Sequence, residues 1–476
     1  NTEKLLEQTI LKLLNNGMEH VDINTPFISL GLDSLSIVQL QSMLLGHKLN
    51  LTTQTFYKFS NIKKLAAYID KSETIHNEIA LSLDPSFLHS ENEKATKNFN
   101  DSELGNVFLT GANGFIGIHI LKELLDTTNS KIYCLVRGAD VQSSLARLQK
   151  SYKYYFGLSI NKYLNRRVFV INGDITKNNL NLSIESKNML ENNTNTIIHT
   201  AAVVKHYGNF EEFKNINIDG TKNLADFALK HNLRFIHLSS ISISGNYLLK
   251  QDNHDIDFSE NNLYIGQHYT ENVYVNSKLE AENVIYSYMK KGLRGKVLRI
   301  GIISGRYSDG FFQENISANA FYSRIKSLAT LKIVSKSMLT QKLEFTPIDE
   351  CVRAIVLLSK TTQYDNKIFH LYNHNLISVE NVLTVLKRFK ISVLALEDEE
   401  FKNQILEYTK SINSDISAIV NDFDTSNLSL NYNFTVNIKS DFTQKILNDL
   451  GFKWKNINNT YLYKIFKHML DVGFIK

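Results

Sequence analysis

The sequence predicts a small all-α module followed by an α/β part. The α/β part is built on a doubly wound parallel sheet and carries a smaller, mainly helical C-terminal lobe. Amphipathic helical patterns account for most of residues 3–70. From residue 107 onward, short apolar runs that end in small or polar residues alternate with helical patterns, which is the order of βαβ units. The first of these runs leads directly into Gly111, Gly114 and Gly117.

Length and composition limit the class of protein. A chain of 476 residues is long enough for two or three domains. A net charge of +5 with no basic block does not favour nucleic-acid binding. Cys134 and Cys351 both lie in apolar patterns, which excludes a disulfide framework and favours a reducing, cytoplasmic compartment. No apolar run is long enough to span a bilayer, so no membrane partner is expected.

The N-terminal module, residues 1–73, has amphipathic patterns at 3–15, 34–45 and 62–70. The sequence Gly-Leu-Asp-Ser-Leu at 31–35 places Ser34 at the start of the second helix, where a serine can act as an N-cap. The motif also resembles the attachment site of acyl and peptidyl carrier proteins. That resemblance implies a four-helix bundle in which Ser34 carries 4′-phosphopantetheine, and a helix N-terminus suits the attached phosphodiester. Residues 74–103, rich in Ser, Asn, Glu and Lys, are expected to be a linker.

A glycine-rich turn follows the first expected strand. The spacing Gly-x-x-Gly-x-x-Gly between a strand and a helix brings backbone N–H groups and a helix N-terminus to a dinucleotide pyrophosphate. The residues predicted to contact the cofactor here are Thr110, Gly111, Gly114, Phe115, Ile116 and Gly117.

The end of the second strand carries a basic residue where an NAD enzyme places an acid. Arg137 occupies this position, and Arg147 follows on a helix. Guanidinium groups suit a 2′-phosphate, so NADPH is expected rather than NADH. Surface charge is the alternative for both arginines.

Further candidate cofactor residues lie where later strands end or where the next helix begins, since carboxyl ends of parallel strands line the ligand crevice. They are Asp174, Ile175, Ala201, Ala202, Val203, Asn217, Ile300 and Gly301, with Tyr274 and Lys278 contributing from a helix. For Asp174, a loop cap is an equally good interpretation.

Three residues form the candidate catalytic set. Ser240 ends a strand, and Tyr274 and Lys278 are four residues apart on one helical face. A phenol of ordinary pKa about 10 is a poor acid–base catalyst at neutral pH, and a nearby ammonium and an oxidised nicotinamide favour its phenolate. A serine hydroxyl can hydrogen-bond the same reacting oxygen.

Residues 104–476 resemble the extended short-chain dehydrogenase/reductase family, in particular the terminal thioester reductase domains of nonribosomal peptide synthetases. Beyond the residues above, the resemblance rests on Arg299, Gly305 and the sequence Phe-Thr-Pro-Ile-Asp at 345–349. It implies a Rossmann-like part at about 104–310 and 345–375, and a substrate lobe at about 311–344 and 376–476. It also implies NADPH-dependent release of a carrier-bound acyl or peptidyl thioester as an aldehyde, with further reduction to an alcohol left open.

The implied partners are the acyl or peptidyl thioester on the carrier arm, upstream adenylation and condensation domains, and a phosphopantetheinyl transferase. Four alternatives stay open: a carboxylic acid reductase fragment, a nucleotide-sugar epimerase or dehydratase, a cyclising release domain without redox chemistry, and a docking scaffold. No zinc or EF-hand spacing is present, so no metal is expected.

Overall fold

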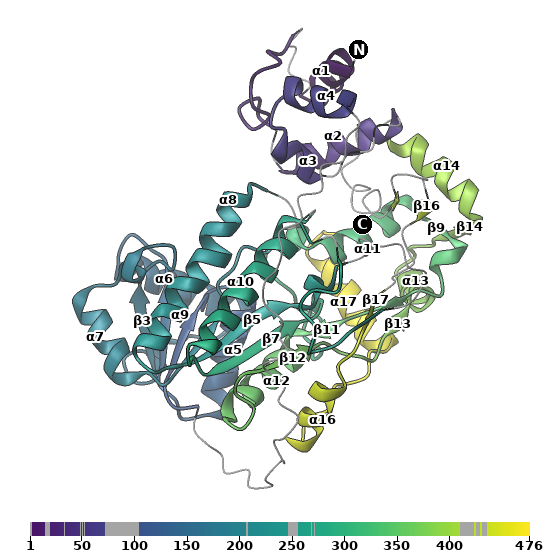
Figure 1. Ribbon diagram of the computed structural model, residues 1–476. Helices are drawn as coiled ribbons and strands as arrows, with labels where there is room; N and C mark the ends of the chain where they lie inside the picture. Colours follow the sequence, from purple (N-terminus) through teal and green to yellow (C-terminus); the bar gives the residue numbers. More distant parts are fainter. Residues whose placement is uncertain are drawn as a thin grey trace.

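The computed structural model describes residues 2–14, 20–32, 34–47, 49, 51, 53–71, 104–205, 208–245, 256–267, 269–270, 272–409, 423–424, 429–430 and 436–476. It has a helical N-terminal module, a parallel sheet covered by helices on both faces, and a mainly helical C-terminal lobe (Figure 1). This is the predicted fold class. The expected linker at 74–103 lies outside the described residues.

The N-terminal module consists of α1 (Thr2–Leu14), α2 (Ser34–Gly46), α3 (Thr53–Lys58) and α4 (Ile62–Lys71). Helix α1 contacts both α2 and α4. Leu6 and Ile10 lie one helical turn apart and are both buried, which gives α1 its apolar face. They share a core with Phe27, Leu40 and Leu65. The all-α module is therefore confirmed.

Seven strands form one parallel sheet in the order β12-β7-β5-β4-β1-β2-β3. Their bounds are β1 (Val107–Thr110), β2 (Ile132–Val136), β3 (Val168–Asn172), β4 (Thr196–His199), β5 (Arg234–Ser240), β7 (Gly295–Ile300) and β12 (Lys367–Leu371). Strands β1, β2, β4, β5 and β7 are buried throughout, which explains their mostly apolar composition. The strand order reverses between β1 and β4, and ligands of doubly wound sheets bind at such a switch point.

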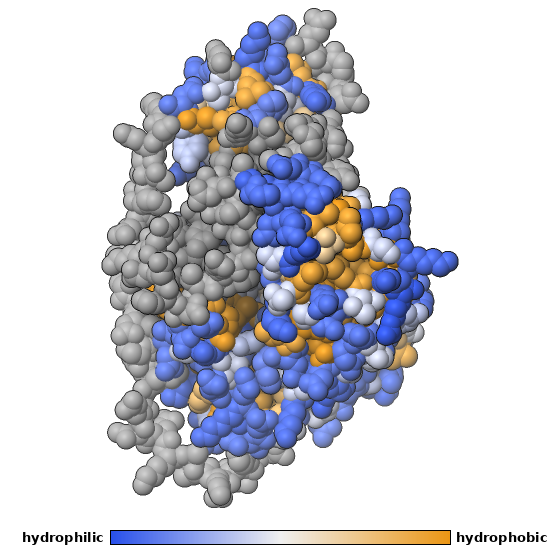
Figure 2. Space-filling model, turned by 90° about the vertical axis from the view of Figure 1, so that its right-hand side faces the viewer, coloured by the Kyte–Doolittle hydropathy of each residue, from blue (hydrophilic) through white to orange (hydrophobic). Residues whose placement is uncertain are grey.

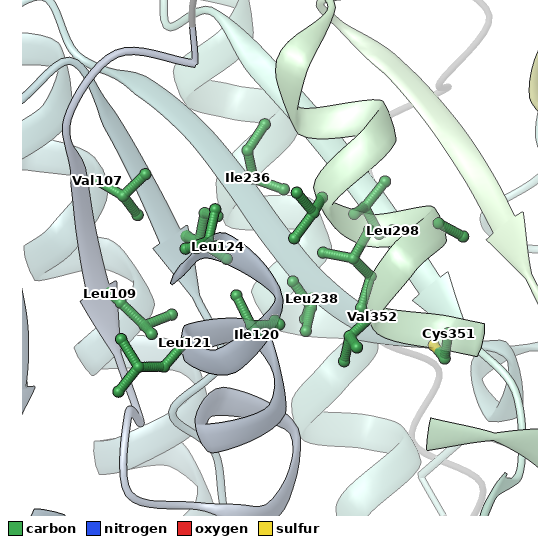
Figure 3. Close-up of a cluster of buried hydrophobic side chains, with 14 of the residues drawn as sticks. Val107, Leu109, Ile120, Leu121, Leu124, Ile236, Leu238, Leu298, Cys351 and Val352 are labelled. Atoms are coloured by element: carbon green, nitrogen blue, oxygen red, sulfur yellow. The ribbon is translucent and has the colours of Figure 1, made fainter. Parts of the chain in front are cut away.

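Helices cover both faces of the sheet. They are α5 (Phe115–Thr127), α6 (Val141–Phe156), α7 (Ile184–Asn193), α8 (Phe210–Phe213), α9 (Gly220–Lys230), α10 (Val273–Lys290) and α12 (Ile348–Lys360). On one face, side chains of α5 and α12 meet those of β1, β5 and β7 (Figure 3). On the other face, α9 and α10 pack on the sheet through a second core that includes Leu224 and Leu279. Cys134 and Cys351 are buried free thiols of the first core.

The remaining elements belong to the lobe or join it to the sheet. They are β6 (Ile256–Phe258), β8 (Ile303–Ser304), α11 (Ala320–Leu331), β9 (Ile333–Ser335), β10 (Lys342–Leu343), β11 (Thr346–Pro347), β13 (Ile377–Ser378), α13 (Val379–Arg388), β14 (Leu394–Leu396), α14 (Asp398–Thr409), β15 (Phe423–Asp424), β16 (Ser429–Leu430), β17 (Val436–Ile438), α16 (Asp441–Asp449) and α17 (Asn459–Asp471). Strand β11 pairs with β8 and leads into α12. Helix α16 packs against β12, and its Leu447 joins the core of the sheet.

The N-terminal module contacts the lobe, because α2 lies beside α14 (Figure 1). Seen from the side of the lobe, apolar residues form one broad area on this face, and smaller apolar areas lie elsewhere in the same view (Figure 2). Among the described residues, no helix combines the length and apolar character needed to cross a membrane.

Candidate active site

The turn between β1 and α5 forms the first wall of the site. Gly111 adopts φ +69°, a left-handed conformation that favours glycine. A Cβ at Gly117 would lie 2.1 Å from the carbonyl oxygen of Gly111, so only glycine fits there. Gly114 is the N-cap of α5 and provides no side-chain hydrogen bond, which leaves the N–H groups of the first turn for a ligand. The backbone at Gly111, Gly114 and Gly117 therefore has the geometry that suits a dinucleotide pyrophosphate.

Two arginines lie together beyond β2. Arg137 directly follows the strand and is exposed. Arg147, on α6, donates from Nη1 to the carbonyl oxygen of Arg137, which brings the two residues to one corner. Asn172 at the end of β3 accepts from the N–H of Gly138 at 3.1 Å and closes this corner. The sequence predicted that both arginines contact the 2′-phosphate. It did not predict their contact with each other, which results from the packing of α6.

Asp174 and Ile175 follow β3. The Asp174 carboxylate accepts from the N–H of Thr176 at 2.9 Å, and its own N–H donates to the carbonyl of Leu180, so it caps a tight loop. Ile175 is buried and packs close to Gly220 at the start of α9.

Ala201, Ala202 and Val203 follow β4 and are partly exposed, although the strand is fully buried. Asn217 connects this segment to α10. Its Oδ1 accepts from the N–H of Val203 at 2.8 Å, and its Nδ2 donates to the Val203 carbonyl and to Ser277 Oγ. Asn217 lies in a π-helical segment, Lys214–Asp219, which is typical of functional sites. Val203 and Asn217, which the sequence predicted separately as cofactor contacts, are thus hydrogen-bonded to each other.

Ser240, Tyr274 and Lys278 come together at the carboxyl end of β5. The Asn272 side chain accepts from the N–H of Tyr274 and so fixes the start of α10. The Ser240 hydroxyl hydrogen-bonds the Tyr274 phenol. Burial raises the pKa of Tyr274, and this hydrogen bond opposes the change, so the phenol is protonated at neutral pH.

Lys278 is buried one turn further along α10, and its Nζ donates to the carbonyl oxygen of Leu238 at 2.7 Å. Burial lowers the pKa of Lys278 to about 8, while the negative charge of Glu282 acts in the opposite direction. The lysine is therefore mainly an ammonium at neutral pH and loses its charge as the pH rises past 8.

A buried ion pair that sequence reasoning did not identify holds α10 against the sheet. Arg299 of β7 donates from Nε and Nη2 to Glu282 at 3.1 and 2.9 Å, and both side chains are fully buried. Arg299 also contacts Tyr286 and His370. Because Glu282 lies one turn after Lys278, this pair fixes the register of the helix that carries Tyr274. A strand arginine and a helix glutamate give no local signal of their contact.

A second feature absent from the sequence predictions is the side chain of Glu344, which lies beside Gly301 where β7 ends. Ile300 is buried in the sheet core, whereas Gly301 is partly exposed. A Cβ at Gly301 would lie 2.1 Å from Glu344 Oε1, so glycine is needed here because the glutamate fills the space. Burial raises the pKa of Glu344 to about 7. Nothing in the sequence places residue 344 next to residue 301.

Thr110 reaches into the sheet rather than only toward the turn. Its Oγ1 hydrogen-bonds His199 Nδ1 at 2.8 Å, and His199 Nε2 bonds Thr221 at 2.9 Å. Burial lowers the pKa of His199 to about 3, with the charge of Lys278 adding to the effect, so this histidine is neutral. The network links β1, β4 and α9 behind the glycine turn.

Comparisons with known proteins agree with this architecture. The model of the phosphopantetheine attachment site family matches residues 4–69, and that of the male sterility protein family matches residues 109–355. A solved thiolation-reductase di-domain from an archaeal nonribosomal peptide synthetase is 29% identical, with a TM-score of 0.83, and the alignment covers 100% of this chain and 98% of that one.

Two curated relatives are much longer than this chain. Nonribosomal peptide synthetase asaC of Aspergillus flavus is 28% identical over 370 residues, covering 75% of this chain and 35% of the relative. A linear gramicidin synthase of Brevibacillus parabrevis is 24% identical over 344 residues, covering 72% of this chain and 6% of the relative. The chain therefore spans about a third or less of the length of these two relatives.

The male sterility match extends over more than half of the chain and includes the glycine turn, Tyr274 and Lys278. The carrier match includes Ser34, the first residue of α2, whose side chain lies outside the described part of the structure. The chain belongs to the male sterility protein family, and it joins a phosphopantetheine carrier domain to the NAD(P)-binding reductase domain of a nonribosomal peptide synthetase.

Proposed function

We propose that this chain reductively releases an acyl or peptidyl group from the pantetheine arm on Ser34, with NADPH as reductant and an aldehyde as product. The observation that carries the proposal is the Ser240–Tyr274 hydrogen bond, one helical turn from the Lys278 ammonium, in a chain that also has a carrier domain. A second reduction of the aldehyde would give an alcohol.

The residues that would hold NADPH lie along the carboxyl edge of the sheet. Residues 110–117 would bind the pyrophosphate, and Arg137 with Arg147 would bind the 2′-phosphate. The segments at 174–175 and 201–203, with Asn217, Ile300 and Gly301, would line the rest of the cofactor site. NADPH, when bound, supplies the hydride that reduces the thioester carbonyl carbon.

Tyr274, Ser240 and Lys278 would manage the charge and the proton of this reaction. Tyr274 is protonated and donates its proton to the carbonyl oxygen as that oxygen becomes negative, while Ser240 donates a hydrogen bond to it. The buried Lys278 ammonium stabilises the phenolate that remains.

The resulting hemithioacetal would then break down without a further redox step. Its hydroxyl proton passes to the Tyr274 phenolate, the carbon–sulfur bond breaks, and the pantetheine thiolate takes a proton from water. The products are the aldehyde and the free thiol of the arm, and Tyr274 is again protonated.

The choice of NADPH over NADH can be tested at the arginine corner. We expect Arg137→Ala to raise KM for NADPH by about 10- to 100-fold, because a charge-assisted hydrogen bond of about 1.5–3 kcal/mol is lost, and to leave KM for NADH nearly unchanged. Steady-state kinetics with both cofactors measure this, and Arg166→Ala, at an exposed arginine before β3, is the control. An equal loss with both cofactors would contradict the assignment.

The role of the carrier can be tested at Ser34. We expect Ser34→Ala to abolish loading by a phosphopantetheinyl transferase and hence all release from the carrier, because no other atom replaces the serine hydroxyl. Reduction of an acyl group on free pantetheine should continue, since the reductase is unchanged. Mass spectrometry of carrier and product measures both.

Ser34→Ala, NADPH oxidation and the choice of adenylation partner each distinguish one alternative from reductive release. A nucleotide-sugar epimerase would be indifferent to Ser34→Ala, and a cyclising release domain would release product from the intact carrier without oxidising NADPH. A carboxylic acid reductase fragment differs in the domain that loads Ser34, so pairing the chain with separate adenylation domains distinguishes it.

A further inference from the structure

Glu344 is held rigidly at the end of β7. Its Oε1 accepts hydrogen bonds from the N–H of Ile302 at 2.7 Å and from Thr346 Oγ1 at 2.6 Å. The same oxygen occupies the space beside Gly301. Two donors on one oxygen fix the plane of the carboxyl group, so the position of the other oxygen is fixed as well.

The second oxygen, Oε2, has no hydrogen bond to any described residue, and it is not fully enclosed by the protein. Glu344 is partly exposed, although burial raises its pKa to about 7. Within the described part of the chain, no positively charged side chain contributes to that pKa. An ionised carboxylate that is largely buried and has no positive partner raises the free energy of the protein, unless a cation binds to it or a proton neutralises it.

Tyr372, next to Gly301, has acidic side chains around it. The pKa of Tyr372 is raised first by burial, and the charges of Glu344, Glu260 and Asp441 raise it further. The Tyr372 hydroxyl donates to the carbonyl of Ile438 and so makes no ion pair with these acids. A positively charged group entering from solvent would meet a negative potential here.

The strand register places this carboxyl on the same edge as the catalytic residues. Ile300 is opposite both Ser240 on β5 and Leu371 on β12, and Gly301 is the next residue. Neighbouring strands are about 4.8 Å apart and consecutive Cα atoms about 3.8 Å apart, and a Cα–Cβ bond is about 1.5 Å long. Because a Cβ at Gly301 would lie 2.1 Å from Glu344 Oε1, that oxygen lies at most about 12 Å from the Ser240 Cα. An acyl group whose thioester carbonyl reaches Ser240 can therefore extend to Glu344.

We propose that Glu344 is a specificity-determining residue that pairs through Oε2 with an ammonium group on the tethered acyl chain, so that amine-bearing thioesters are the preferred substrates. This inference rests on the proposed reductive release. The ammonium group of the substrate would supply the positive charge that no described side chain provides to Glu344.

The test compares Glu344→Gln with the wild-type chain on substrate pairs that differ in an amine. The carrier is loaded at Ser34 with alanyl or propionyl groups, and with ε-aminocaproyl or caproyl groups, and NADPH oxidation is followed. Glutamine keeps an oxygen for Ile302 N–H and Thr346 but removes the charge. The wild-type chain should favour the amine-bearing member of at least one pair by about 10- to 100-fold in kcat/KM, the range of a hydrogen bond to a charged group.

Glu344→Gln should abolish this preference and leave the rate with the amine-free member within about twofold, since its reacting groups are unchanged. Glu380→Gln, at an exposed position on α13, should behave as wild type. Thermal melting and NADPH binding verify that Glu344→Gln is folded.

Three results would overturn the inference. They are an equal wild-type rate for both members of each pair, an unchanged preference in Glu344→Gln, or an equal loss with both members. Reductive release itself would stand after any of these. A wild-type chain that oxidises no NADPH with any loaded substrate would instead overturn the proposed function together with this inference.

Discussion

Replacing Tyr274 with phenylalanine is expected to lower kcat for NADPH-dependent release by about a thousandfold, within the range that general acid catalysis provides. The phenol is the group that protonates the carbonyl oxygen, and burial keeps it protonated at neutral pH. Phenylalanine fills the same space, so the helix and NADPH binding should be retained. Stopped-flow measurement of NADPH oxidation on the loaded carrier gives the rate, and fluorescence titration gives the affinity for NADPH.

The matched control is Tyr288→Phe, which removes the same hydroxyl from the same helix. Tyr288 OH bonds Asp226 and not Ser240, so its loss should leave the rate within a few-fold of wild type. A Tyr274→Phe chain that releases aldehyde at the wild-type rate would show that another group donates the proton.

Gly117→Ala is expected to weaken NADPH binding by about a hundredfold, equivalent to about 2.7 kcal/mol, and to lower thermal stability as well. The added methyl would lie 2.1 Å from the Gly111 carbonyl oxygen, a backbone atom that cannot move without opening the turn. Isothermal titration with NADPH and a thermal melt measure the two effects.

Gly114→Ala is the comparison for stability. Its Cβ would meet only the Gly111 carbonyl oxygen, at 3.2 Å, so the protein should melt close to wild type. If Gly117→Ala bound NADPH as tightly as wild type, the turn would not be the pyrophosphate site.

The local pattern of the sequence was sufficient for the secondary structure that surrounds the site. The helices predicted at 34–45 and 62–70 are each one residue longer at the C-terminal end, as α2 and α4, and the helix predicted at 3–15 is shifted by one residue, as α1. These predictions succeed because apolar periodicity and helix-capping residues act over a few neighbouring positions. The site motifs also involve only a few neighbouring positions. They are the glycine spacing, the serine at the end of β5 and the spacing from Tyr274 to Lys278.

Contacts between distant segments could not be predicted in this way. The Arg147–Arg137 contact, the bonds of Asn217 to Val203 and Ser277, and the buried Arg299–Glu282 pair each join different elements. Their partners are chosen by how helices pack on the sheet, which no short window of sequence encodes.

The sequence by itself determined that a helical module precedes the α/β part and that a glycine turn joins a strand to a helix, and it singled out Ser34, Ser240, Tyr274 and Lys278 as candidate site residues. Only the tertiary structure showed that Glu344 lies against Gly301 with one oxygen held and one without a partner among the described residues. The physical reason is that strands β7 and β11 and the segment before β11 meet through long-range packing, and burial then changes the chemistry of a carboxyl group that the sequence presents as ordinary.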